Sequence, residues 1–200
     1  MIAWGFELGF REGNLSPVQF AAKAKSQGYR WAALELDDYG NDQRWGPFRH
    51  ACQAEGLKAG PWFTEGGNVR NTPADADFTI AEVESEGDRL GAIESAPLIP
   101  ASVPRRAVIT NFTPMTDGQG VPQPEKAKPL IDLGYECLTE SYIGDSPGMN
   151  PDDMNFRACA QLGWPRSQPV FGIWNAPLAD YQQYIPRFPA YGIYLAEYLL

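Results

Sequence analysis

The stretch Gly28-Tyr29-Arg30-Trp31-Ala32-Ala33-Leu34-Glu35-Leu36 carries the pattern that decides the fold. A glycine ends an amphipathic segment, an apolar residue follows it, and a short apolar run begins at Trp31. Glycine suits the left-handed conformation that closes a helix, and the next apolar residue packs against the last helical turn. The same joint recurs at Gly56-Leu57, Gly134-Tyr135 and Gly163-Trp164. Such repeated joints predict alternating strands and helices around a parallel sheet.

Short runs of apolar, β-branched and aromatic residues bounded by turn residues predict eight strands. They are 3–8, 31–36, 58–63, 78–84, 106–112, 135–142, 169–174 and 192–197. Helices are expected to begin at Ser16-Pro17, after Ser85 and at Asn150-Pro151, where a capping residue, a proline or both open the first turn.

These elements predict an α/β fold, a compact (β/α)8 TIM-type barrel that forms one domain over residues 1–200. Its helices would be trimmed, and no eighth helix would follow the last strand, so a second copy or another chain is expected to cover strand eight. An open doubly wound sheet is the alternative. Leu8-Gly9-Phe10-Arg11, after the first strand, is not the glycine-rich phosphate loop that many such sheets carry.

The charge balance is acidic, with 25 Asp and Glu against 16 Lys and Arg and a formal net charge of −9. Such a surface repels phosphate backbones, and no basic run offsets it, so nucleic acid is not an expected partner. The start of the sequence lacks the basic and apolar segments of a signal peptide. No apolar run reaches the roughly 20 residues that a membrane span needs. We therefore expect cytoplasmic synthesis and no membrane partner.

Carboxylates gather where the predicted strands end, which in barrels of this type is the face that carries the chemistry. They are Glu7, Glu35, Asp37, Glu65, Glu82, Glu84, Glu140 and Glu197. Side chains two residues apart on a strand share a face, so Glu82 and Glu84 should both point inward above Ile80. Facing outward, they would be buried under helices without partners, at a cost of several kcal/mol each. The same reasoning places Glu35 and Asp37 inside.

Carboxylates in a partly closed cavity raise one another's pKa, which yields a proton donor beside a charged base. Glycoside hydrolysis uses such a pair. Aromatic residues at strand ends, among them Trp62, Tyr142 and Trp174, would offer flat faces for a sugar ring. Alternatively, each acid caps a helix, pairs with an arginine or faces water. An all-oxygen Ca²⁺ or Mg²⁺ site also stays open, although no loop motif supports it.

The remaining chemistry-bearing residues exclude several mechanisms. The single histidine, His50, falls in the middle of a predicted helix, which argues against a Ser-His-Asp triad and a multi-histidine zinc site. No lysine lies at a predicted strand end, which argues against Schiff-base chemistry. We therefore predict neither a metal nor another cofactor.

The segment Phe78-Thr79-Ile80-Ala81-Glu82-Val83-Glu84 resembles the fourth-strand acid-x-Glu motif of family 25 glycoside hydrolases, the lysozyme-type barrels. Similar barrels occur as domains of bacteriophage virion proteins. The resemblance implies Glu84 as the catalytic acid, Glu82 in the place of the family's paired aspartate and Glu7 as the acid of strand one.

The first hypothesis is therefore a glycoside hydrolase-like barrel that hydrolyses a polysaccharide or cell-wall glycan. Glu84 would be the general acid, and Glu82 or Glu140 the base or nucleophile. Substrate would be bound by Glu7, Glu35, Asp37, Trp62, Tyr142 and Trp174. The alternative is a catalytically inactive barrel that serves as a structural or host-binding part of a bacteriophage virion, in its tail or capsid.

Overall fold

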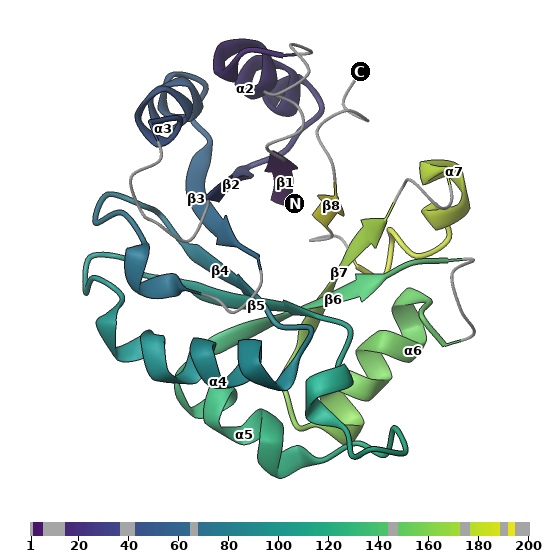
Figure 1. Ribbon diagram of the computed structural model, residues 1–200. Coiled ribbons are helices and arrows are strands. Elements are labelled where there is room, and N and C mark those ends of the chain that lie inside the picture. The colour runs from purple at the N-terminus through teal and green to yellow at the C-terminus, as the bar shows by residue number, and fades with distance from the viewer. Residues whose placement is uncertain are drawn as a thin grey trace.

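A computed structural model describes residues 2–5, 15–36, 43–64, 68–143, 148–172, 177–188 and 192–194. These residues form an α/β fold in which helices surround a curled parallel sheet (Figure 1). The strands are β1 (Ile2–Gly5), β2 (Trp31–Leu36), β3 (Lys58–Phe63), β4 (Thr79–Glu82), β5 (Arg106–Thr110), β6 (Tyr135–Ser141), β7 (Ser167–Gly172) and β8 (Gly192–Tyr194). The α-helices are α2 (Pro17–Ser26), α3 (Trp45–Ala54), α4 (Glu86–Ser95), α5 (Pro124–Asp132), α6 (Pro151–Phe156) and α7 (Leu178–Tyr181).

The strands pair in chain order. From β2 to β7, each strand lies parallel to the next and forms one continuous curled sheet. The short β1 pairs with β2 and with β8, and β8 also pairs with β7. This order confirms the predicted α/β class, and it lacks the reversal of strand order that defines a doubly wound sheet.

Local sequence signals explain where the helices begin. Ser16 accepts a hydrogen bond from the backbone of Gln19, whose side chain accepts one from the Ser16 backbone. Ser85 and Asp88 form the same reciprocal capping box at α4. The Asn150 side chain caps α6. All three predicted helix starts are therefore confirmed.

The predicted helix-to-strand joints are also confirmed. Gly28, Gly56, Gly134 and Gly163 all have φ between +69° and +89°, the left-handed region in which only glycine is free of strain. Each lies just beyond a helix, where it turns the chain into the connection before the next strand.

Side-chain alternation divides the core into two parts. Apolar residues inside the curled sheet form one cluster: Ala33, Trp62, Phe78, Ile80, Ala107, Ile109, Leu138 and Val170. Ala81 and Val83 belong to a second and larger cluster that includes buried side chains of the surrounding helices. The predicted faces of the fourth strand are thus confirmed, with Ile80 inside and its neighbours outside.

The fourth and fifth strands each end two residues earlier than predicted, and the sixth ends one residue earlier, at Ser141. The fourth strand ends at Glu82 rather than Glu84, because residues 84 and 85 turn into the capping box of α4. The fifth ends at Thr110 rather than Phe112, because the Thr110 hydroxyl accepts a hydrogen bond from the Phe112 backbone and Phe112 has φ of 71°. Residues 6–8, 173–174 and 195–197 of the predicted strands lie outside the described residues. No helix in the described part of the chain is long and apolar enough to cross a membrane.

Candidate active site

Three glutamates meet at the carboxyl ends of β4 and β6. Ile80 and Leu138 both belong to the cluster inside the sheet, and Glu82 and Glu140 each lie two residues further along the same strands. The period of two therefore turns both carboxylates toward the interior. Together with Glu84 they form the carboxylate cluster, in which one oxygen of each side chain lies within 4.8 Å of one oxygen of the other two.

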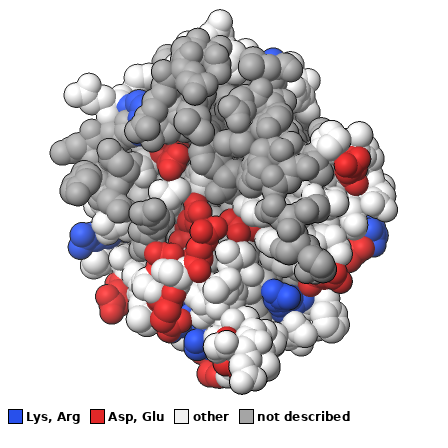
Figure 2. Space-filling view, turned by 45° about the vertical axis from the view of Figure 1, so that its right-hand side comes forward, with Lys and Arg blue, Asp and Glu red and all other residues white. Residues whose placement is uncertain are grey.

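The cluster runs from the interior toward solvent. Glu140 is only 1% exposed, Glu82 is half-buried and Glu84 is exposed. Oε1 of Glu140 and Oε2 of Glu82 are buried, and neither has a hydrogen-bond partner among the residues that the structure describes. Acidic side chains gather near the centre of the face shown in Figure 2, toward which β6 and β7 point in Figure 1. The cluster therefore combines a buried floor with a solvent-facing rim.

Burial and like charges shift the acidity of the two inner members. The pKa of Glu82 is raised to about 8, first by burial and then by the negative charges of Glu84, Glu35 and Asp88, while the nearby Trp62 indole opposes the shift. The pKa of Glu140 is raised to about 9, again first by burial and then by the charges of Glu84 and Glu82. At neutral pH both side chains are therefore mainly uncharged carboxylic acids, which can donate a hydrogen bond.

Polar side chains from neighbouring strands surround the cluster. Glu35 on β2 is half-buried and accepts a hydrogen bond of 3.4 Å from the Thr64 hydroxyl just beyond β3. Tyr142, just after β6, forms a hydrogen bond with Glu140 that counteracts part of its pKa shift. No ion pair between described residues involves Glu82, Glu84 or Glu140. The cluster is thus not paired with a basic side chain of the described chain.

The predicted site residues fall into two groups. Glu82, Glu84 and Glu140 come together, while Glu35 lies near the end of β2, Trp62 near the end of β3 and Tyr142 just after β6. Glu7, Asp37 and Trp174 lie outside the described residues. His50 lies exposed on α3, in the middle of the helix as predicted.

Trp62 differs from the expected exposed platform for a sugar ring. Its side chain is buried inside the sheet with Ile80 and Leu138. Its indole N–H lies close enough to Glu82 to oppose the rise of that group's pKa, so Trp62 contributes to the surroundings of the cluster. Contact between its ring and a substrate stays a prediction.

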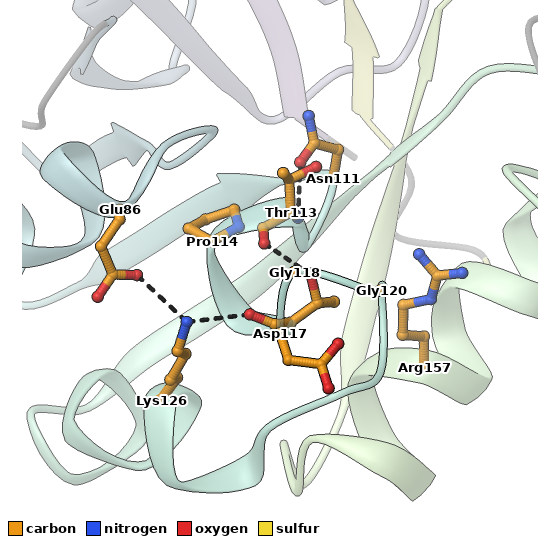
Figure 3. Close-up of a pocket in the computed structure, with 10 residues that line it drawn as sticks. Glu86, Asn111, Thr113, Pro114, Asp117, Gly118, Gly120, Lys126 and Arg157 are labelled. Carbon is orange, nitrogen blue, oxygen red and sulfur yellow. Dashed lines mark hydrogen bonds and ion pairs between the residues drawn. The ribbon is translucent and has the colours of Figure 1, made fainter.

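A hollow of about 600 Å³ lies beside the loop that follows β5. The sequence did not predict it. Figure 3 shows Lys126 between Glu86 and this loop. The Lys126 ammonium group donates a hydrogen bond of 2.9 Å to the Thr116 carbonyl and lies 3.8 Å from the Glu86 carboxylate. Asn111 and Arg157 also line the hollow. The run Asn111-Phe112-Thr113-Pro114 after the strand is the sequence signal for this loop.

No protein-family model matches the sequence, and no curated protein matches it. Solved structures do match. A sialic acid (N-acetylneuraminic acid) synthetase from Leptospira borgpetersenii serovar Hardjo-bovis, in complex with citrate, has a TM-score of 0.58 at 11% identity, over 97% of this chain and 71% of that chain. A truncated form of 3-deoxy-D-arabino-heptulosonate 7-phosphate synthase from Thermotoga maritima has a TM-score of 0.53 at 10% identity, over 97% of this chain and 73% of that chain. At these identities the likeness concerns the fold.

These comparisons overturn the resemblance to family 25 glycoside hydrolases. The two structures reported above are named as synthases, and neither is named as a glycan-cleaving enzyme or a virion protein. The hydrolase hypothesis and its bacteriophage alternative are therefore wrong. The motif at Glu82-Val83-Glu84 spans three residues, and any strand with two inward-facing acids at its end produces it.

Proposed function

We propose that the chain is a single-domain enzyme with a (β/α)8 TIM-type barrel, and that the carboxylate cluster is its catalytic centre. The fold part of this proposal is supported by the ring of pairings from β1 to β8 and by the likeness to two synthases over 97% of the chain. The helices would be trimmed, with none after β8. Catalytic groups of such barrels lie at the carboxyl ends of the strands, where the cluster lies.

One observation carries the catalytic part of the proposal. The Glu140 carboxyl is buried beside Glu82 and Glu84, and its Oε1 has no hydrogen-bond partner among the described residues. A buried polar atom without a partner costs on the order of 1–3 kcal/mol, and the repulsion from two neighbouring acids adds to that cost. Groups kept in such surroundings are concentrated at functional sites.

The three carboxyl groups suit the removal of a proton next to a carbonyl group. Glu84 lies at the exposed rim, so it is placed to accept a proton from a bound substrate. The buried carboxyls of Glu82 and Glu140 would donate hydrogen bonds to the carbonyl oxygen, on which negative charge develops as the proton leaves. Glu84 is thus proposed as the base, and the other two as the groups that stabilise the oxyanion.

We propose a small polyhydroxylated carbonyl compound as the substrate. The two similar structures are named for the synthesis of sialic acid and of a heptulosonate phosphate, and the first was solved with citrate. All three are small molecules rich in oxygen. Carboxyl groups with unpartnered oxygens can bind the hydroxyl groups of a compound of this kind.

Proton exchange with solvent tests this proposal without knowledge of the product. Sugars, sugar acids and keto acids are incubated with the protein in D₂O, and loss of the C–H signal next to the carbonyl is followed by proton NMR. Wild type is expected to exchange at least one compound, and Glu84→Gln to slow that exchange by at least 10²-fold, since a general base contributes about 10²–10⁴-fold. Glu94→Gln, an exposed glutamate on α4, is the matched control. Exchange by Glu84→Gln at the wild-type rate would refute the role of Glu84.

A further inference from the structure

The spacing within the carboxylate cluster matches the first coordination sphere of a metal ion. Oxygens bound to Ca²⁺ at 2.3–2.6 Å are at most about 5 Å apart across the ion, and those bound to Mg²⁺ at most about 4.2 Å. One oxygen each from Glu82, Glu84 and Glu140 lies within 4.8 Å of the other two. The three oxygens are therefore close enough for one ion of the size of Ca²⁺ to reach all of them after a small movement of the side chains.

A second observation, independent of the spacing, indicates a ligand at this place. Glu140 is almost completely buried, and its Oε1 has no partner among the described residues, as is also true of the buried Oε2 of Glu82. Buried carboxylates are as a rule paired, hydrogen-bonded or bound to a metal. No lysine or arginine of the described chain forms an ion pair with the cluster. A cation from solution would supply the missing partner.

The donor atoms define the class of ion. The cluster offers carboxylate oxygens only, without a histidine nitrogen or a cysteine sulfur. Oxygen ligands suit Mg²⁺, Mn²⁺ and Ca²⁺, whereas Zn²⁺ and Cu²⁺ prefer nitrogen or sulfur ligands. We propose that Glu82, Glu84 and Glu140 together bind one divalent cation of this oxygen-preferring class.

The proposed ion deepens the proposed function and rests on it for its role in catalysis. Three carboxylate oxygens fill half of an octahedral sphere, so the other positions are left for water or for substrate oxygens. The ion would polarise a substrate carbonyl in place of the two acidic protons of Glu82 and Glu140. The second oxygen of Glu84 would stay available as the base.

Ion binding is tested directly, without substrate. The protein is treated with a chelator and titrated calorimetrically with Mn²⁺ and with Ca²⁺, and Tb³⁺ is titrated while its emission is excited through tryptophan. The Trp62 indole lies close enough to Glu82 to influence its pKa, and it is therefore close enough to sensitise a bound Tb³⁺ ion. We expect one ion per chain, with at least tenfold weaker binding in Glu140→Gln and in Glu84→Gln. Glu94→Gln should bind as wild type does.

The outcomes separate this inference from the proposed function. Equal affinity in all variants, or no saturable binding below about 1 mM, the weak end of protein Ca²⁺ sites, would overturn the ion site. Glu84 is exposed, so Glu84→Gln remains a valid test even where Glu140→Gln does not fold. Ion binding without deuterium exchange would overturn the function and keep the site. Exchange by chelator-treated protein that binds no ion would overturn the site and keep the function.

Discussion

At the scale of single residues, ionisation of the buried Glu140 carboxyl lowers the free energy of unfolding as the pH rises. Its pKa is raised from 4.5 to about 9, so the folded protein holds this proton more tightly than the unfolded chain does. The stability that depends on this group is fully present below about pH 4.5 and is lost as the pH rises toward 9. Glu140→Gln removes the ionisation. We expect it to match wild type at pH 4 and to be about 1–3 kcal/mol more stable at pH 9.

Urea denaturation at both pH values, with a chelator present, measures this difference. Glu94→Gln on the surface of α4 is the control and should change stability little at either pH. A Glu140→Gln variant that is less stable than wild type at pH 9 would show that the carboxylate stabilises the fold.

Gly60 of β3 lies directly against Phe78, the residue that precedes β4. A Cβ atom at this position of β3 would lie 2.5 Å from both the ring and the carbonyl oxygen of Phe78. Gly60→Ala must therefore displace Phe78 or its strand, and we expect a loss of about 1–3 kcal/mol in the free energy of unfolding. Gly118→Ala, where a Cβ meets no atom within 4 Å, is the matched control for thermal unfolding. Equal midpoints for the two variants would contradict this role of Gly60.

At the scale of elements, the start of α4 connects a helix cap to the site. The Asp88 carboxylate accepts hydrogen bonds from the backbone of Ser85 and of Glu84, so the capping box also fixes the exposed member of the cluster. Ser85→Ala is expected to lower the free energy of unfolding by about 1 kcal/mol and to weaken ion binding and deuterium exchange. Ser85→Thr is expected to retain most of the stability, the ion binding and the exchange. Unfolding in urea measures the first effect. If Ser85→Ala lowers stability but leaves deuterium exchange unchanged, the capping box does not position the site.

Sequence patterns predicted the elements well where local signals are strong. The bounds of β2 and β3 match the predicted runs, because turn residues flank both. The ends of the fourth and fifth strands differ from the predicted ends, because hydrogen bonds of Asp88 and Thr110 turn the chain earlier than the apolar pattern suggests. Alternation also gave the direction of Glu82 correctly. Alternation could not predict that the Trp62 side chain is buried, since its burial depends on which strands pack over it.

At the scale of the whole molecule, function could not be read from a short motif. Acids at the carboxyl ends of parallel strands recur in enzymes with different chemistry, so the acid-x-Glu pattern at Glu82 did not identify a hydrolase. Glu140 was predicted to act with the acids of the fourth strand, but its distance from them could not be predicted, because that distance depends on the register of β4, β5 and β6. What the chain does must be derived from the cluster itself.

The net charge of −9 bears on what can enter the site. An anionic substrate would be repelled by an acidic mouth, and a bound cation would reverse that repulsion locally. We therefore expect sugar acids to bind more tightly when Mn²⁺ is present, while neutral sugars should respond less. Calorimetric titration of one sugar acid and of its neutral parent sugar, with and without Mn²⁺, tests this expectation. An equal response of both compounds would contradict it.

The account's central claim is that Glu82, Glu84 and Glu140 are held together for function and at the expense of stability. The free energy of unfolding of the triple variant Glu82→Gln, Glu84→Gln, Glu140→Gln, compared with wild type at pH 8 without divalent ions, tests it most directly. We predict a triple variant that is about 2–4 kcal/mol more stable, because charge repulsion and buried ionisable groups are removed. A triple variant less stable than wild type would contradict the claim and assign the cluster a structural role.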